Sequence, residues 1–522
     1  MHRFRALRAH GRQFYSTFPE KLAVNPHPSS SSTTPSTMNS MHPPSLAADQ
    51  DDPLVPSLHS AYEEQSNGNG SSFSTGNPGS SSSSSSSGSG NQSSNGGVGT
   101  GTTAVRLPSF HDVVAARKRI AGRLRVTPLN YSHGLSKLTN NDVYIKLENN
   151  QVTGSYKERG ALNNLLQLSP QEAKNGVVLA SAGNHAQAVA FHAQALGIDA
   201  KIVMPTTTPI AKIVGTRRWG GTIILHGESF DDAAMEAQKI SIAENRLYVH
   251  AFDRFNTIAG QGTLGLELFD QCPDLDAVVV PIGGGGVIAG VSMVLKELNP
   301  DIKVFGVEAE NMASGFLSKK QHIVTEVPFR ATIADGIAVR RVGNMVLPYL
   351  EKYVDDIALV NENEISLAVL RLLQYEKTVV EGSGSTTLAA LLNKKLPLEN
   401  KKVALICTGG NIDMTILGKI IERGLVQDGR LARIVVTMHD RPGSLAQVLS
   451  AIGKEKASVR QVEHERAFMD MKTPIGFVKT QIELETESFE HVERIIDSLK
   501  NCPPVVSIGL QDPTGTIRTQ LD

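Results

Sequence analysis

Lys157 has sequence neighbours that an ordinary surface lysine does not need. Small, turn-forming residues precede it, and apolar residues at helical spacing follow it at Leu162, Leu165, Leu166 and Leu168. This pattern predicts that the amine lies in the first turn of a helix, where the partial positive charge of the helix end disfavours an ammonium group. A lysine held as an imine avoids that conflict. The alternative is a solvated lysine at a helix start, and the rest of the chain must decide between the two.

Three turns made of small residues follow predicted strands and precede predicted helices. They are Ser-Ala-Gly-Asn-His at 181–185, four glycines at 283–286 and Thr-Gly-Gly-Asn at 408–411. Successive glycines allow backbone N–H groups to converge on an anion at a helix N-terminus, which suits a phosphate group. Together with Lys157, the three turns indicate a pocket.

The elements that must position these turns alternate between strand and helix. Apolar runs predict strands at 143–147, 177–179, 202–204, 223–225, 278–280, 304–307 and 403–406, with amphipathic helices between several of them. Strands that are apolar on both faces indicate parallel sheets covered on each side, so the fold class is α/β. In such sheets ligands bind beyond the carboxyl ends of the strands, where the three turns occur.

A dinucleotide-binding enzyme is the main competing interpretation of the glycines. Gly284, Gly286 and Ala289 fit the dinucleotide pattern, and Glu308 ends the next strand where a ribose-binding acid would lie. This interpretation leaves Lys157 and the 181–185 turn unexplained. The chain also has no phosphate-loop signature of nucleotide triphosphatases.

Composition excludes several other classes. The 522 residues have a net charge of −1, which provides no electrostatic footprint for nucleic acid or an anionic membrane. The three cysteines are too few and too scattered for a disulfide framework or a zinc site, so a reducing compartment is expected. The uncharged run at 277–295 resembles a membrane span, but its four glycines predict strand, turn and helix instead.

The first 105 residues differ from the rest. Residues 1–20 carry four arginines and only one acidic residue, at their end, which is typical of a mitochondrial presequence; a plain disordered tail is the alternative. The localisation is therefore expected to be cytoplasmic or mitochondrial. Residues 21–105 are rich in Ser, Gly and Asn and should be disordered, because they have too little apolar content to offset the entropy of ordering.

The last hundred residues predict a second domain, at about 431–515. Strands at 433–439, 459–467, 477–485 and 505–510 and helices at 444–453 and 488–500 give the ferredoxin-like order βαββαβ. The turn at 440–445 resembles the first turn of ACT domains, which bind small ligands between paired copies. The resemblance implies an amino-acid effector and a homo-oligomer, either dimer or tetramer, and the alternative is a dimerisation module without a ligand.

The motifs around Lys157, 181–185, 283–286 and 408–411, taken in this order, resemble the fold type II pyridoxal-phosphate enzymes, the tryptophan synthase β-like fold. Within that group the chain is similar to the catabolic threonine ammonia-lyases, with serine racemase a near relative. The resemblance covers about residues 106–425 and implies two subdomains with parallel or mixed sheets, the smaller at about 176–253.

The resemblance implies a role for each motif residue. Lys157 would be the Schiff-base lysine and general base, and Gly283, Gly284, Gly285 and Gly286 would hold the phosphate of pyridoxal 5'-phosphate. Asn184 would bond the pyridine 3-hydroxyl, and the Thr408 hydroxyl would face the pyridine nitrogen, leaving it unprotonated and favouring β-elimination. Ser181, Asn184 and His185 would contact the substrate, with Ser181 and its turn taking the carboxylate.

The implied reaction is the conversion of L-threonine to 2-oxobutanoate and ammonia, and of L-serine to pyruvate. Two alternatives stay open, namely a serine racemase and a non-catalytic amino-acid sensor. In serine racemase a serine precedes the Gly-Asn-His of the turn, whereas here the residue is Ala182, which cannot carry a proton. The sensor would require loss of the cofactor residues, all of which are present.

The sequence also singles out Glu308, Glu381 and His192. Glu308 matches one ligand of the divalent-cation site of these relatives, but Ser314 stands where a second carboxylate is expected, so no strong metal site is predicted. Glu381 is expected to have a positioning role, in preference to the alternative of a proton-transfer role. His192 has no partner that the sequence reveals.

Overall fold

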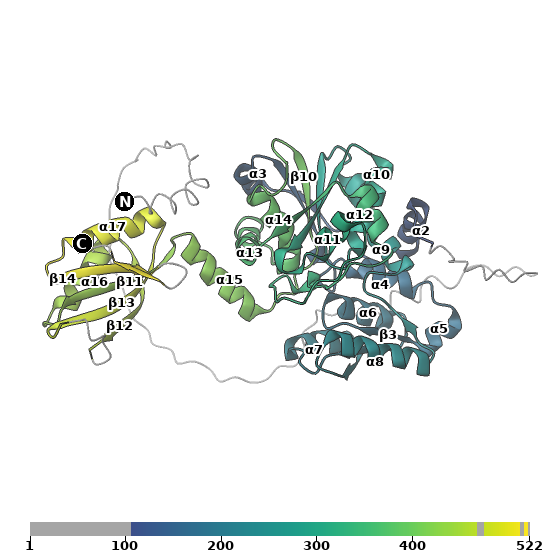
Figure 1. Cartoon of the computed structure of the whole chain (residues 1–522), viewed down its shortest axis with the longest axis horizontal. Coiled ribbons are helices and arrows are strands. Elements are labelled where there is room, and N and C mark those ends of the chain that lie inside the picture. Colours follow the sequence, from purple (N-terminus) through teal and green to yellow (C-terminus); the bar gives the residue numbers. More distant parts are fainter. Residues whose placement is uncertain (1–105, 467–473, 512–515, 520–522) are drawn as a thin grey trace, which may run out of the picture. The chain divides into compact units, whose positions relative to one another are not determined.

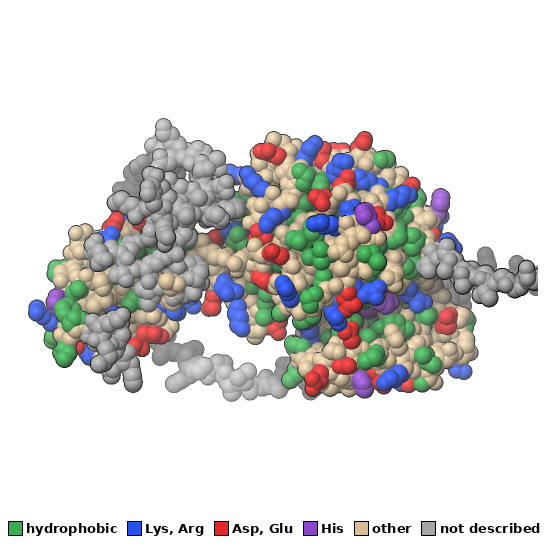
Figure 2. Space-filling view, in the orientation of Figure 1, with side chains coloured by type: hydrophobic (Ala, Val, Ile, Leu, Met, Phe, Trp, Pro, Cys, Tyr) green, Lys and Arg blue, Asp and Glu red, His purple; other side chains and the backbone are tan. Residues whose placement is uncertain are grey.

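The computed structural model describes residues 106–466, 474–511 and 516–519. The expected presequence at 1–20 and the expected disordered segment at 21–105 lie outside the described residues. Figure 2 shows basic and acidic side chains interspersed on the face in view, in line with the net charge of −1.

A six-stranded sheet forms the centre of the larger subdomain, where Figure 1 labels β10. The strand order is β1-β2-β10-β7-β8-β9. Its strands are β1 (Leu129–Tyr131), β2 (Asp142–Leu147), β7 (Ala277–Pro281), β8 (Lys303–Ala309), β9 (Asp356–Val360) and β10 (Lys402–Cys407). All neighbours pair in parallel except β1 and β2, so the sheet is mixed.

Helices cover both faces of this sheet. Val278 and Val280 of β7 enter one core while Ala277 and Val279 enter the other, and all four are fully buried. The first core is closed by α2 (Phe110–Ile120), α9 (Phe255–Gln271), α10 (Gly286–Leu298) and α12 (Leu347–Tyr353). The second is closed by α3 (His133–Thr139), α13 (Glu362–Glu376) and α14 (Gly382–Leu392). Burial on both faces explains why the strands are continuously apolar.

A four-stranded parallel sheet, in the order β5-β4-β3-β6, forms the smaller subdomain. Its strands are β3 (Val177–Ala180), β4 (Ala200–Met204), β5 (Thr222–Leu225) and β6 (Leu247–Tyr248). One face packs against α4 (Lys157–Leu165) and α6 (Asn184–Ala195), the other against α8 (Phe230–Ala243). The other α-helices between residues 106 and 428 are α5 (Pro170–Asn175), α7 (Ile210–Arg217), α11 (Ser314–Gln321) and α15 (Met414–Gln427).

All seven strands expected before residue 407 are present, and the α/β class with its two sheets is confirmed. Residues 277–295 form β7, the glycine turn and most of α10. Among the described residues, no helix is long and apolar enough to cross a membrane. The three cysteines are all free and buried.

The C-terminal domain contains a sheet in the order β12-β13-β11-β14-β15. Its elements are β11 (Leu431–His439), α16 (Ser444–Lys454), β12 (Ser458–Glu465), β13 (Phe477–Glu485), α17 (Phe489–Lys500), β14 (Val505–Gln511) and β15 (Ile517–Thr519). The expected βαββαβ order is confirmed, and a short antiparallel strand, β15, follows it. Both helices pack on one face of the sheet around Ile434, Val436 and Ile482, all fully buried.

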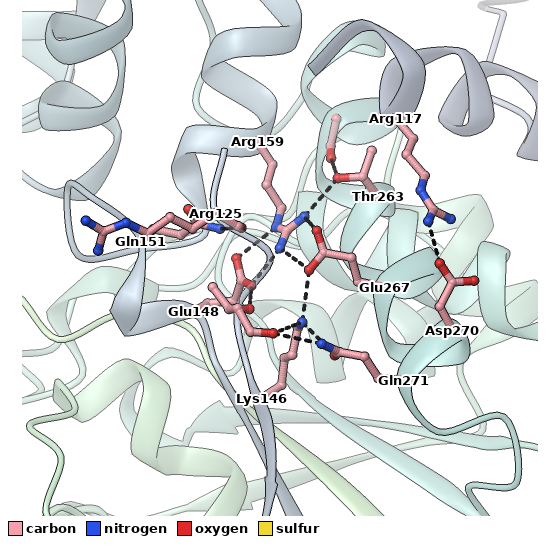
Figure 3. A network of polar contacts seen from close by, with 12 residues as sticks. Arg117, Arg125, Lys146, Glu148, Gln151, Arg159, Thr263, Glu267, Asp270 and Gln271 are labelled. Atoms are coloured by element: carbon pink, nitrogen blue, oxygen red, sulfur yellow. Dashed lines mark hydrogen bonds and ion pairs between the residues drawn. The ribbon is translucent and has the colours of Figure 1, made fainter. Parts of the chain in front are cut away.

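A buried cluster of four charged residues joins β2, the 3-10 helix that follows it (Glu148–Asn150), α4 and α9 (Figure 3). The Arg159 guanidinium of α4 donates to both oxygens of Glu148 at 2.8 Å. It also donates to both oxygens of Glu267 on α9, at 2.7 and 2.8 Å. Lys146 of β2 donates to Glu267 at 2.9 Å. Two cations and two carboxylates balance formally, which removes the largest cost of burying charge.

Glu148 illustrates how this balance works. Burial alone would raise the pKa of its carboxyl group, but the charge and hydrogen bonds of Arg159 outweigh burial and hold the pKa below its ordinary value. Glu148 therefore stays ionised although it is fully buried. Removing Arg159 would leave an uncompensated charge in the interior.

We predict that Arg159→Met lowers the free energy of unfolding of the catalytic domain by about 3–5 kcal/mol. The matched control is Arg117→Ala, because Arg117 also pairs with α9, through Asp270, but both side chains are about half exposed. This variant should cost less than about 1 kcal/mol. Urea unfolding followed by the fluorescence of Trp219, the one tryptophan of the chain, measures both. Equal losses in the two variants would contradict the role of the buried cluster.

Candidate active site

Lys157 is the first residue of α4, as the sequence predicted. Its amine is half-buried and donates a hydrogen bond to the carbonyl of Ala251, at 3.1 Å. Ala251 lies in the segment between β6 and α9. The amine is therefore held against backbone from the carboxyl side of the smaller sheet.

The loop before Lys157 is fixed by the turn after β10. Tyr156 N–H donates to the Thr408 carbonyl and Gly410 N–H donates to the Gly154 carbonyl, both at 3.0 Å. Gly154 has a φ of +77°, and a Cβ there would lie 2.8 Å from the Asn411 side chain. Position 154 thus requires glycine both because of its positive φ and because the Asn411 side chain leaves no space for a Cβ. Thr408, which is 3% exposed, is consequently held next to the start of α4.

The turn at 283–286 connects β7 to α10 and has no room for side chains. A Cβ at Gly284 would lie 2.2 Å from the ring of Phe252, and one at Gly285, whose φ is +86°, would lie 2.4 Å from Val346. The backbone N–H groups at this end of α10 form a cradle that suits an anion such as a phosphate. Because Phe252 directly follows Ala251, the cradle is close to the Lys157 amine along the same segment.

The turn after β3 provides three polar side chains. Ser181 Oγ accepts a hydrogen bond from Gly183 N–H at 3.3 Å. Asn184, the first residue of α6, donates from Nδ2 to both carboxylate oxygens of Glu381, at 2.8 and 3.1 Å. Its Oδ1 accepts from Asn411 Nδ2 at 2.8 Å. The amide of Asn184 is therefore held on both sides.

His185 lies deeper than its neighbours. Its Nε2 is 2.9 Å from the Val249 carbonyl, so this nitrogen carries the proton. Burial, with the nearby Lys157 charge as a second cause, lowers the pKa of His185 to about 3. The imidazole is neutral, and its contact with backbone favours an orienting role over substrate contact.

Glu381 is 4% exposed at the start of α14. Burial and the nearby Asp335 carboxylate raise its pKa to about 7, against the opposing hydrogen bond from Asn184. A group that titrates near neutrality in a polar site is a functional candidate. Its direct contact with Asn184 agrees with the positioning role expected from the sequence.

Two buried hydroxyls at the site have no hydrogen-bond partner in the part of the chain that the structure describes. Ser155 Oγ lies two residues before Lys157, and Ser383 Oγ lies two residues after Glu381. Unpaired buried polar atoms cost free energy unless a ligand or water completes them. Together with the glycine cradle, they fit a site built to receive a polar cofactor.

Sequence reasoning missed several residues of this site. His192 does have a partner, because its Nε2 lies 3.2 Å from Glu158 Oε2 in the interior. Phe252 and Asn411 also contribute, the first by covering Gly284 and the second by bonding Asn184. The Thr-Gly-Gly-Asn motif could have indicated Asn411, but no local pattern marks Phe252 or the pairing of His192 with Glu158.

Glu308 is fully buried at the end of β8, and burial raises its pKa to about 8. Its two oxygens accept hydrogen bonds from Gly315 N–H at 2.8 Å and Phe316 N–H at 2.7 Å. Within the described ranges, no group of three or more His, Cys, Asp or Glu residues is placed to hold a metal ion. The absence of a strong metal site stays a prediction.

Comparison with known proteins agrees with the geometry. Residues 120–409 match the model of the pyridoxal-phosphate dependent enzyme family, and residues 428–509 match the ACT domain model. The chain is 45% identical to an L-threonine ammonia-lyase of Thermotoga maritima, over 74% of this chain and 96% of the relative. It is 40% identical to another of Geobacter sulfurreducens, over 75% and 97%.

Solved structures give the same picture. A threonine deaminase of Solanum lycopersicum is 37% identical with a TM-score of 0.57, covering 60% of this chain and 91% of the other. Maize serine racemase is 32% identical with a TM-score of 0.58, covering 61% and 98%. These findings confirm the resemblance that the motifs indicated. The chain belongs to the pyridoxal-phosphate-dependent enzyme family that includes the L-threonine ammonia-lyases, and it carries an ACT domain after its catalytic domain.

Proposed function

We propose that this protein catalyses the β-elimination of L-threonine to 2-oxobutanoate and ammonia, and of L-serine to pyruvate and ammonia. The observation that carries the proposal is the placement of the Lys157 amine. It lies beside the segment that covers the glycine cradle, and Lys157 directly follows a loop that is bonded to Thr408. The names of the two relatives described above support the same reaction. We assign residues 106–425 to catalysis, with a smaller subdomain at about 176–253, and residues 431–515 to the ACT domain.

Each residue of the cofactor site has a role that its chemistry suits. The cradle at Gly283 to Gly286 would hold the phosphate, Asn184 would bond the 3-hydroxyl, and the Thr408 hydroxyl would face the pyridine nitrogen. Bound pyridoxal phosphate supplies an electron sink for the electrons left at the substrate Cα when its proton is removed. A neutral hydroxyl at Thr408 limits that sink, which favours prompt loss of the β-hydroxyl group.

Lys157 is the proposed general base. Its amine, once released from the cofactor, takes the Cα proton, and it can then return a proton to the departing β-hydroxyl, which leaves as water. The unsaturated amine that is released takes up water and yields the 2-oxo acid and ammonia, so no net water is consumed. Ser181, which accepts from Gly183 N–H, keeps its own hydroxyl proton for the substrate carboxylate.

The racemase alternative receives less support from the site. Racemisation needs a proton carrier on the face of Cα opposite the lysine, and Ala182 in the 181–185 turn has no group that can serve. We therefore expect elimination to dominate, although the structural relatives include serine racemase.

We predict that Lys157→Ala lowers the rate of 2-oxo acid release from L-threonine and L-serine by roughly a hundredfold to ten-thousandfold. A matched control is Lys201→Ala, which removes a lysine paired with Glu244 on the smaller subdomain and should keep the rate. A spectrophotometric assay for 2-oxo acid measures the rates, and chiral chromatography measures D-serine. D-serine formation without any 2-oxo acid from the wild type would replace the lyase by the racemase.

We predict that Glu381 makes the stability of the cofactor-free protein pH-dependent. Its pKa rises from an ordinary 4.5 to about 7 on folding, so its contribution is fully present below pH 4.5 and is lost as the pH rises to about 7. Relative to Glu381→Gln, the wild type should therefore lose roughly 3 kcal/mol of unfolding free energy across this window. Urea unfolding at several pH values tests this, with the exposed Glu399→Gln as control. Parallel pH curves for wild type and Glu381→Gln would refute it.

We propose that the ACT domain binds an amino-acid effector and joins copies of the chain in a homo-oligomer. The turn between β11 and α16 supports the effector site, because Gly443 has a φ of +88° and, chain neighbours apart, no atom of the described residues lies within 4 Å of a Cβ built there. A carboxylate could thus approach the first turn of α16, an eleven-residue helix.

We predict that at least one amino acid changes the rate of 2-oxo acid release by the wild type, and that Gly443→Asp abolishes the response through charge repulsion. Gly453→Asp, at the opposite end of α16 and equally open, is the control and should keep it. Light scattering should give a multiple of 56.0 kDa. A monomeric wild type that responds to no amino acid would refute both parts.

The compartment depends on residues 1–20. We keep cytoplasm and mitochondrion as equal alternatives, and a fluorescent fusion of these twenty residues decides between them by the organelle it labels.

A further inference from the structure

A continuous chain of hydrogen bonds runs through the site and connects the two helices that begin with Lys157 and Asn184. Its members come from α4, α6 and three loops, in the order His192, Glu158, Thr153, Asn411, Asn184 and Glu381. Thr153 bonds Glu158 through its hydroxyl and Asn411 through its backbone carbonyl, and all the other links are between side chains. It begins at His192 on α6, returns to that helix at Asn184 and ends at Glu381, just before α14. The mechanism proposed above uses only one of its members, Asn184.

The end of the hydrogen-bond chain that contains Glu158 and His192 is buried in the interior. Glu158 is fully buried, although it directly follows Lys157, and His192 is 4% exposed. Glu158 Oε2 contacts His192 Nε2 at 3.2 Å, and Oε1 accepts from both the N–H and the hydroxyl of Thr153. The carboxylate therefore clamps the loop before Lys157 to α4 and to α6 together.

The middle of the chain is a single amide. Asn411 Nδ2 donates to the Thr153 carbonyl and to Asn184 Oδ1, both at 2.8 Å. Because Nδ2 has two protons, it can satisfy both acceptors at once. An oxygen in its place would face two acceptors and could satisfy neither. Asn411 thus transmits the position of the clamped loop to Asn184.

The direction of the Asn184 amide follows from its two neighbours. Asn411 offers a donor, so Asn184 must turn Oδ1 toward it, and Glu381 offers carboxylate oxygens, so Nδ2 must turn toward them. A flipped amide would place its Nδ2 donor against the Asn411 donor and, when Glu381 is ionised, its Oδ1 acceptor against the carboxylate. Two polar neighbours of opposite character therefore select one of the two orientations.

We propose that this chain is a positioning device that fixes the orientation of the Asn184 amide at the cofactor site, with Asn411 as its central link and the Glu158–His192 contact as its anchor. The inference rests on the proposed role of Asn184 toward the 3-hydroxyl of pyridoxal phosphate. Asn411, Glu158, His192 and Glu381 are then positioning residues, which act through Asn184.

Asn149 provides a closely matched control for Asn411, the central link of the hydrogen-bond chain. Asn149 is also a half-buried asparagine whose Nδ2 makes two hydrogen bonds, to Thr378 Oγ1 at 2.8 Å and the Val379 carbonyl at 3.0 Å. It lies beside Gly410, the residue before Asn411. It has no hydrogen bond to a member of the chain among those described. Asn149→Ala therefore removes similar structure without interrupting the chain.

The experiment titrates cofactor-free protein with pyridoxal phosphate and records its absorption spectrum. Asn411→Ala should weaken cofactor binding by about tenfold, and Asn149→Ala should change it by less than about twofold. Asn411→Ala should also change the balance of the two absorption bands of the bound cofactor, which depends on the hydrogen bond to its 3-hydroxyl. A loss of general stability would not alter that balance.

A second pair of variants tests the anchor. Glu158→Gln keeps an acceptor for Thr153 and should bind the cofactor within about twofold of the wild type, whereas Glu158→Leu should weaken binding by about tenfold. Should Glu158→Leu fail to fold, the asparagine pair decides alone.

The outcomes separate this inference from the proposed function. Equal affinities and spectra for Asn411→Ala and Asn149→Ala, in a wild type that binds the cofactor and releases 2-oxo acid, would overturn the positioning device alone. A wild type that does not bind pyridoxal phosphate would overturn the proposed function, and the positioning device with it.

Discussion

Arg159 has the largest side chain that is fully buried among the described residues, and its charge is compensated on two sides by Glu148 and Glu267. A guanidinium without these partners could not stay in the interior, so α4 can occupy this place only when β2 and α9 are also in position. Lys157 lies two residues earlier on the same helix. The buried cluster therefore ties the place of the Lys157 amine to the packing of the larger subdomain.

Backbone, more than side chains, forms the rest of the site. The turns after β3, β7 and β10 lie at carboxyl ends of parallel strands, and glycines make close approach possible there. Gly284 lies against Phe252, and Gly154 lies against Asn411, so a methyl group at either position would displace a residue of the site. Small residues are needed at these positions because the neighbouring segments already fill the space.

Burial sets the charge state of the groups around Lys157. His185 is held neutral with its proton directed at backbone, and Glu381 has a pKa near neutrality because it is buried close to Asp335. Glu158 and His192 form a buried contact next to the N-terminal end of α4, the helix that begins with Lys157. The Lys157 amine is thus surrounded by few fully charged side chains that would disfavour the binding of an anionic ligand.

The sequence by itself determined the α/β class, the strands, the place of Lys157 at a helix start, the three turns and the βαββαβ order of the C-terminal domain. These features depend on short-range periodicity and on the special backbone of glycine, which can be recognised within about ten residues. The family followed because the motifs occur in a specific order. Only the tertiary structure decided the partners of His192, Asn411 and Glu381. Asn184 meets Asn411 across 227 residues and Glu381 across 197, and such meetings depend on how the two sheets pack, which no local pattern records.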